Sequence, residues 1–260
     1  MTETILRLDS VTCDYRMPGG GKFRAVEKVS LELERGQVLG LVGESGCGKS
    51  TLAKLICGLE KADSGSIDFA GTPVSALGYR RRRKELLGIQ MVFQNPYASL
   101  NPRRRIGDQI KDALAVDVER RWTVGDLLEA VDLPADSADR FPHAFSGGQR
   151  QRIAIARALA AGPQVLIGDE PIASLDAFLQ SRIAKMMRDL ALESQASLLF
   201  ISHDLSVVRE IADKVAVMEA GQIVETGPTE QVWSAPEHPY TQKLLASIPR
   251  VDGKGIIPNV

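Results

Sequence analysis

One glycine-rich run in the sequence has residue types and spacing suited to holding phosphate groups. It matches the pattern GxxxxGK[ST] and consists of Gly43, Glu44, Ser45, Gly46, Cys47, Gly48, Lys49 and Ser50. Its glycines let successive backbone N–H groups point at phosphate oxygens, and a following helix adds its positive N-terminal end. We expect Lys49 to reach the β- and γ-phosphates, Ser50 to bind Mg²⁺ and Thr51 to contact the α-phosphate. The apolar run before it and the helical periodicity after it favour this reading over an ordinary glycine-rich turn.

Two adjacent carboxylates follow a second apolar run. Residues 165–167 are apolar, and Gly168 separates them from Asp169 and Glu170. Ligands of α/β proteins bind at the carboxyl ends of the strands, so we expect this pair to lie beside the glycine-rich run. Asp169 is predicted to hold Mg²⁺ through water, and Glu170 to polarise the water that attacks a phosphoryl group. The structural alternative is an acidic helix start, which the helix dipole also favours.

A second candidate anion site lies before another helical run. Ser146, Gly147, Gly148 and Gln149 precede residues 153–159, which have helical character. Small residues at a helix N-terminus expose N–H groups to a phosphate. The alternative is a helix capped by Ser146 after a flexible turn.

Two polar residues stand directly after apolar runs that predict strands. Gln94 follows residues 91–93, and His203 comes soon after residues 199–201. In isolation a glutamine there is an ordinary loop residue, and a histidine there is usually structural. Their role therefore depends on the motifs around them.

Taken together, these motifs resemble those of the ABC ATPases, from about residue 5 to residue 248. Phe145 and the four residues after it resemble the signature motif, with phenylalanine where leucine is usual. Residues 165–170 resemble Walker B, although Gly168 replaces a larger or alanine residue. Residues 173–176 resemble the D-loop with the alanine and serine exchanged, and Asp176 is retained.

The resemblance implies ATP as the nucleotide and a head-to-tail dimer. The phosphate loop of one subunit would face residues 146–149 of the other, and Asp176 would help to couple the two sites. Gln94 would touch Mg²⁺ and the attacking water, and His203 would contact the γ-phosphate. Tyr15 is the best candidate for stacking on adenine; the alternative is a half-buried strand tyrosine.

Two further stretches resemble the ATPase subunits of peptide and nickel importers. They are residues 92–103 and residues 236–245, which contain the HPYT segment. The implied partners are a second ABC ATPase subunit, identical or paralogous, two transmembrane permease subunits and, indirectly, an extracytoplasmic solute-binding protein. The implied location is the cytoplasmic face of the inner membrane. A subunit of a carbon–phosphorus lyase assembly stays open as an alternative, whereas DNA-repair and translation ATPases usually carry coiled-coil insertions or paired ABC domains.

Composition limits the remaining function classes. The 260 residues are 44% hydrophobic and carry a net charge of -1. This charge provides no positive electrostatic field that would attract a nucleic acid. The three cysteines, Cys13, Cys47 and Cys57, form no CxxC pair, so no metal cluster is predicted. We find no uncharged apolar run near the roughly 18 residues of a membrane span, so we expect membrane contact through partners.

The predicted fold is α/β, a P-loop NTPase of the ABC type. Alternating apolar residues near residues 6–8 and 29–33 predict an N-terminal antiparallel subdomain, with a hairpin loop at residues 17–22. Apolar runs at residues 38–42, 89–93, 165–167, 198–201 and 215–218 predict a mixed or parallel core sheet. We expect a helical insertion at about residues 97–157 within a nucleotide-binding domain of residues 1–232, and a C-terminal extension at 233–260. The arginine runs at 80–83 and 103–105 are more ordinarily solvated faces than binding sites.

Overall fold

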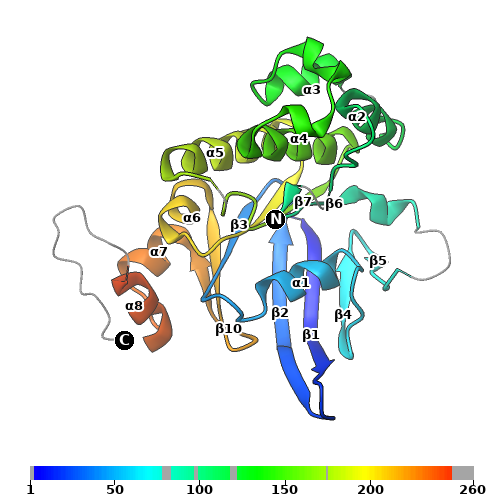
Figure 1. Ribbon diagram of the computed structural model, residues 1–260. Helices are drawn as coiled ribbons and strands as arrows, with labels where there is room; N and C mark the ends of the chain where they lie inside the picture. The colour runs from blue at the N-terminus through cyan, green and yellow to red at the C-terminus, as the bar shows by residue number, and fades with distance from the viewer. Residues whose placement is uncertain (1–2, 78–82, 97–98, 118–121, 174, 248–260) are drawn as a thin grey trace.

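The part of the chain that the structure describes forms two β-sheets with helices packed around them (Figure 1). The computed structural model describes residues 3–77, 83–96, 99–117, 122–173 and 175–247. Its strands are β1 (Thr4–Arg16), β2 (Lys22–Glu34), β3 (Val38–Val42), β4 (Ser64–Phe69), β5 (Thr72–Pro73), β6 (Ile89–Val92), β7 (Val165–Asp169), β8 (Ser197–Ile201), β9 (Lys214–Glu219) and β10 (Gln222–Pro228). Its helices are α1 (Lys49–Ile56), α2 (Ile106–Leu114), α3 (Val124–Ala130), α4 (Gly147–Ala160), α5 (Ala177–Glu193), α6 (Leu205–Ile211), α7 (Thr229–Ser234) and α8 (Pro239–Ala246). Single 3-10 turns are η1 (Glu85–Gly88), η3 (Ala135–Asp139) and η4 (Pro142–Ala144).

The smaller sheet is antiparallel and begins with the predicted hairpin. Its strand order is β2-β1-β4-β5. The turn between β1 and β2 closes with a hydrogen bond from the Met17 N–H to the Gly21 carbonyl, and Gly19 and Gly20 adopt φ of 102° and 91°. Glycine adopts positive φ values without steric strain, whereas other residues are strained there. The two glycines therefore allow the turn to form at the predicted position.

The larger sheet carries the predicted apolar runs in the order β10-β9-β3-β8-β7-β6. Strands β9, β3, β8, β7 and β6 pair in parallel, and β10 adds an antiparallel edge. Every residue of β3, β7 and β8 is buried, as expected for strands covered on both faces. The parallel core sheet with its antiparallel N-terminal partner is therefore confirmed.

Strand β3 separates two hydrophobic cores because successive side chains point to opposite faces. Leu39 and Leu41 belong to the core that the two sheets and α1 share, and Val38 and Val42 belong to the core under the helices α4, α5 and α6. Gly40 faces α6, where an added Cβ would lie 2.4 Å from a methyl group of Val208. The glycine thus allows α6 to approach the sheet closely.

The described residues between 99 and 157 form helices and turns without a strand. Figure 1 shows α2 and α3 packed on the side of α4 away from the sheet. Two residues of the second arginine run are exposed and ion-paired, Arg104 with Asp112 and Arg105 with Asp139. This matches the predicted solvated face.

The final helices α7 and α8 pack beside β10 and α6 (Figure 1). Across the described residues, no helix combines the length and apolar character needed to cross a membrane. Most of the first arginine run (80–82), Ser174 of the D-loop and the tail beyond residue 247 lie outside the described residues.

Candidate functional site

The phosphate loop, residues 43–51, connects β3 to α1 and depends on its glycines. Gly43, Gly46 and Gly48 adopt φ of 155°, 83° and 112°. An added Cβ would lie 2.1 Å from the Met218 carbonyl oxygen at Gly43, and 2.1 Å from the Ala25 carbonyl oxygen at Gly48. The loop therefore fits between β2 and β9 only with glycine at these two positions.

Lys49 lies inside this loop with 3% of its surface exposed. Its Nζ donates hydrogen bonds of 2.8 Å to the Gly43 carbonyl and 2.9 Å to the Glu44 carbonyl. Within the described part of the chain no carboxylate forms an ion pair with it. The third partner of Nζ is the sulfur of Cys47, at 3.8 Å. A buried ammonium bonded to two carbonyls and a thiol, and to no carboxylate, is well suited to attract the negative charge of a phosphate.

Ser50 and Asp169 provide oxygen ligands next to Lys49. The Ser50 hydroxyl donates a 2.8 Å hydrogen bond to Oδ1 of Asp169. Burial raises the pKa of Asp169, and the Ser50 hydrogen bond partly offsets that effect. Mg²⁺ prefers hydroxyl, carboxylate and phosphate oxygens and relieves the cost of a buried carboxylate charge, so this donor pair fits the cation.

Glu170 stands at the centre of a second cluster. Its φ of 46° is unusual for a residue with a side chain, and its N–H donates to the Ile201 carbonyl at 3.0 Å. Oε2 of Glu170 accepts a 3.3 Å hydrogen bond from Nε2 of Gln94 and lies 3.4 Å from Nδ1 of His203. The three residues follow β7, β6 and β8, which are neighbours in the sheet and end at the same edge.

A cavity of about 240 Å³ lies over the phosphate loop. It is lined by Tyr15, Phe23, Ala25, Ser45, Gly46, Gly48, Lys49, Ser50, Thr51, Gln94 and Glu170. Nine of the predicted site residues line this cavity, and Asp169 and His203 adjoin it through their contacts with Ser50 and Glu170. Gly43, Glu44 and Cys47 do not line this cavity, and Glu44 uses its N–H elsewhere, in a hydrogen bond to Tyr240.

The outer wall of the cavity is aromatic. Tyr15 of β1 pairs in register with Phe23 of β2, whose surface is 49% exposed. Phe23 was not predicted from the sequence, because its position opposite Tyr15 depends on the exact register of the two strands. Two rings at the open end of a phosphate-binding cavity can hold a nucleobase between apolar surfaces.

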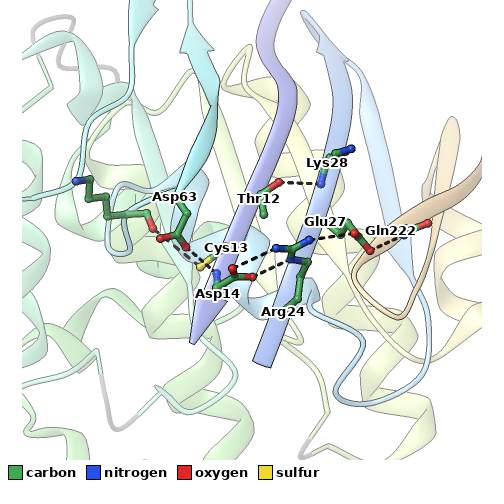
Figure 2. Close-up of polar contacts among 9 residues, drawn as sticks. Thr12, Cys13, Asp14, Arg24, Glu27, Lys28, Asp63 and Gln222 are labelled. Atoms are coloured by element: carbon green, nitrogen blue, oxygen red, sulfur yellow. Dashed lines mark hydrogen bonds and ion pairs between the residues drawn. The ribbon is translucent and has the colours of Figure 1, made fainter. Parts of the chain in front are cut away.

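A polar network beside these rings fixes the hairpin (Figure 2). Nε of Arg24 donates to Asp14 at 2.9 Å, Nη1 of Arg24 donates to Glu27 at 3.2 Å, and Gln222 donates to Glu27 at 2.6 Å. The hydrogen bond from Arg24 lowers the pKa of Asp14, with burial opposing it. Because the Asp14 N–H also bonds a carboxylate oxygen of Asp63 at 2.7 Å, the network joins β1, β2, β10 and the segment before β4.

The signature tip, residues 146–149, lies away from this cavity. Ser146 and Gln149 form a capping box at the start of α4, with hydrogen bonds of 3.3 Å and 2.9 Å. An added Cβ at Gly147 would meet no atom within 4 Å. Asp176 caps α5 by accepting the Leu179 N–H at 3.0 Å. These predicted residues therefore do not join the phosphate loop within one chain.

Helix α4 is nevertheless tied to the segment around Gln94. The buried Gln151 donates a 3.3 Å hydrogen bond to the carbonyl of Phe93, the residue before Gln94. The guanidinium of Arg157 donates to the Ser99 carbonyl further along the same segment. A displacement near Gln94 would thus reach the helix that carries the signature tip.

A larger cavity, about 860 Å³, lies at the opposite ends of the parallel strands. Its lining includes Arg35, Gly88 and Gln164, which precede β3, β6 and β7. It contains none of the phosphate-loop residues. Since α/β sheets place ligands at the carboxyl ends of their strands, we assign the chemistry to the smaller cavity.

Two family models match the sequence. One, described as ABC transporter, covers residues 26–173. The other, described as oligopeptide/dipeptide transporter, C-terminal region, covers residues 224–259. Together they span the phosphate loop, the carboxylate pair and the HPYT segment.

Similar proteins and structures agree with these matches. A putative peptide import ATP-binding protein of Brucella abortus is 48% identical, over 95% of this chain and 78% of that protein. The di/tripeptide transport ATP-binding protein DppF of Pseudomonas aeruginosa is 44% identical, over 96% and 80%. Among solved structures, cbiO1 of Clostridium perfringens, part of an ABC transporter complex, aligns with a TM-score of 0.75 and 29% identity over 90% of this chain and 92% of that chain. A dimeric ATP-binding cassette, MJ0796, bound to ADP and Pi aligns with a TM-score of 0.74 and 26% identity over 86% and 98%.

Proposed function

The chain belongs to the ABC transporter family and is an ATP-binding ATPase, and on that premise we propose that it energises the import of peptides. The observation that carries the proposal is the similarity to peptide import ATP-binding proteins along nearly the whole chain. The match of residues 224–259 to the C-terminal region of oligopeptide and dipeptide transporters supports it from a separate segment. Nickel or another small solute is the second candidate cargo. Peptides come first because the relatives from Brucella abortus and Pseudomonas aeruginosa are named for peptide import and di/tripeptide transport.

In the proposed site, ATP lies with its phosphates on the phosphate loop and its base toward Tyr15 and Phe23. The buried ammonium of Lys49 binds the β- and γ-phosphates, and the N–H groups of the loop after Glu44 bind the remaining phosphate oxygens. Ser50 and Asp169 hold Mg²⁺, with Gln94 as a further ligand. When bound, Mg²⁺ neutralises charge that develops on the phosphate oxygens.

Glu170 is the proposed catalytic carboxylate. Its Oε2 orients and polarises the water that attacks the γ-phosphate, because phosphoryl transfer depends mainly on a positioned nucleophile. Gln94 and His203, bonded to or close to the same oxygen, hold the Glu170 side chain in that position. His203 also contacts the γ-phosphate in this proposal.

The signature tip of a second subunit completes each site. The N–H groups of Gly147 and Gly148 lie in the first turn of α4, where a helix leaves its N–H groups without an intrahelical acceptor, so they suit a γ-phosphate presented by a partner. Asp176 lies at the start of α5 and links the two sites across the dimer. The partner is a second copy of this chain or a related subunit; the dimeric state of the similar cassette supports pairing.

The proposed chain of coupling runs from Gln94 into the helical insertion, at about residues 97–157, and then to two permease subunits. The connections of Gln151 to Phe93 and of Arg157 to Ser99 support this route. A solute-binding protein on the other side of the membrane would deliver the cargo. In this proposal the chain lies at the cytoplasmic face of the inner membrane, as a nucleotide-binding domain of residues 1–232 with an extension at 233–260.

A growth and uptake experiment tests the proposed cargo. A strain that lacks the gene and requires one amino acid is supplied with that amino acid only within a peptide. We expect growth and uptake of the labelled peptide to be restored by the wild-type chain and not by Lys49→Ala. Uptake that is independent of the gene, or copurification with carbon–phosphorus lyase subunits in place of permeases, would contradict the proposal.

A further inference from the structure

The C-terminal helix α8 reaches the phosphate loop through one side chain. Tyr240 is the second residue of α8 and is 8% exposed. Its hydroxyl oxygen accepts a 3.0 Å hydrogen bond from the N–H of Glu44, a residue 196 positions earlier in the chain. Burial is the main cause that raises the pKa of Tyr240, so the hydroxyl stays protonated at neutral pH. The contact is therefore a neutral hydrogen bond that a Phe substitution removes.

Helix α8 is itself held firmly where it begins. Nδ1 of His238 accepts the Tyr240 N–H at 3.2 Å and caps the helix. The carboxylate of Glu225, on β10, accepts the N–H groups of Glu237 and His238 at 3.0 Å each. Thr241 is buried beside Tyr240. The Tyr240 hydroxyl is thus positioned by helix α8, which hydrogen bonds hold to β10, the edge strand of the larger sheet.

The first residues of the phosphate loop are held from two sides. Lys49 bonds the carbonyls of Gly43 and Glu44, and Tyr240 bonds the N–H of Glu44. A triphosphate competes with the two carbonyls for the Lys49 ammonium, because charge-assisted hydrogen bonds are stronger than neutral ones. The bond to Tyr240 involves no group that the phosphates need. It remains when the Lys49 bonds weaken.

We propose that Tyr240 is a positioning residue for the nucleotide site. It holds the Gly43 and Glu44 end of the phosphate loop while Lys49 turns to the phosphates. The inference rests on the proposed function, since it requires ATP on the phosphate loop. By reciprocity, nucleotide that fixes this end of the loop also stabilises the docking of α8 on the domain.

The test compares Tyr240→Phe with Leu244→Ala, both in the full chain. Leu244 is packed against the same core from α8, and its alkyl side chain can form no hydrogen bond to the phosphate loop, so its truncation loosens the helix without removing such a bond. We expect both variants to lower the Tm of the nucleotide-free protein. We expect only Tyr240→Phe to raise the Kd of a fluorescent ATP analogue with Mg²⁺, by about two- to tenfold, the effect of one lost hydrogen bond. The KM for ATP should rise by the same factor with little change in kcat.

Hydrogen exchange provides a readout that does not depend on activity. In the wild-type chain, Mg·ATP should slow exchange of the α8 amides, and in Tyr240→Phe this protection should disappear. A Kd like that of the wild type, together with a Tm loss like that of Leu244→Ala, would show Tyr240 to be structural only and overturn the inference. Failure of the wild-type chain to bind Mg·ATP would instead overturn the proposed function.

Discussion

The side-chain amide of Gln94 donates a 3.3 Å hydrogen bond to the Glu170 carboxylate. The two residues are 76 positions apart, and the parallel pairing of β6 with β7 places them at one edge of the sheet. The same oxygen of Glu170 lies 3.4 Å from Nδ1 of His203. Three consecutive strands of the sheet therefore fix the position of a single carboxylate oxygen.

Replacing this carboxylate should separate binding from hydrolysis. Glu170→Gln keeps the size of the side chain and one acceptor oxygen, but it replaces the other oxygen with an N–H donor and removes the negative charge. We expect phosphate release to fall by at least about a hundredfold, because a general base is lost, with the Kd of Mg·ATP unchanged. Glu193→Gln, at the exposed end of α5, is the matched control and should hydrolyse ATP normally. Normal turnover by Glu170→Gln would remove the proposed role of this residue.

The rings of Tyr15 and Phe23 should contribute to binding of the base of ATP and not to binding of its phosphates. Tyr15→Ala and Phe23→Ala each remove one ring from the cavity. We expect each to weaken ATP binding by about 1 to 3 kcal/mol, the range for stacking of a base on an aromatic side chain. Binding of inorganic tripolyphosphate, which has no base, should not change. An equal loss for both ligands would indicate damage to the loop in place of a lost stacking surface.

The network of Figure 2 predicts a pH-dependent change in stability. Arg24 lowers the pKa of Asp14, so the folded state favours the charged carboxylate. The resulting stabilisation is present above the ordinary Asp pKa of about 4 and is lost as the pH falls through the lowered value. Arg24→Gln should therefore have a lower Tm than the wild type at pH 7, and the difference should shrink below about pH 4. A difference that is constant with pH would contradict this assignment.

The signature tip offers a substitution that the fold can accept. Space is open around Gly147, so Gly147→Leu should leave the Tm and the Kd of ATP unchanged. Hydrolysis should fall sharply, since the added side chain would block the γ-phosphate of a partner subunit. Gly125→Leu, in the first turn of α3, is the control and should remain active. Full hydrolysis by Gly147→Leu would argue against a shared site.

Local patterns explain what could be predicted from the sequence. The residues of the phosphate loop are contiguous in the sequence, and its glycines predict the positive φ values that the structure contains. Asp169 and Glu170 could be placed because buried strands deliver their following residues to one edge of a parallel sheet. Gln94 and His203 could be added by the same rule once the strands were recognised.

The remaining features depend on contacts that no local pattern encodes. Phe23 lines the cavity because of the register of β1 and β2, and that pairing contains several irregularities that the sequence does not reveal. Tyr240 reaches Glu44 from the other end of the chain through the docking of a separate helix. Both contacts arise from tertiary packing, so periodicity and motif spacing give no sign of them.

Binding of Mg·ATP to the phosphate loop should depend on the buried ammonium of Lys49. Titration calorimetry of Lys49→Ala measures this most directly, with Lys111→Ala, an exposed lysine of α2, as the control for the lost charge. We predict heat of binding for the wild type and for Lys111→Ala, and none for Lys49→Ala at the same concentrations. Binding of Mg·ATP by Lys49→Ala with the affinity of the wild type would show that the Lys49 ammonium does not hold the nucleotide.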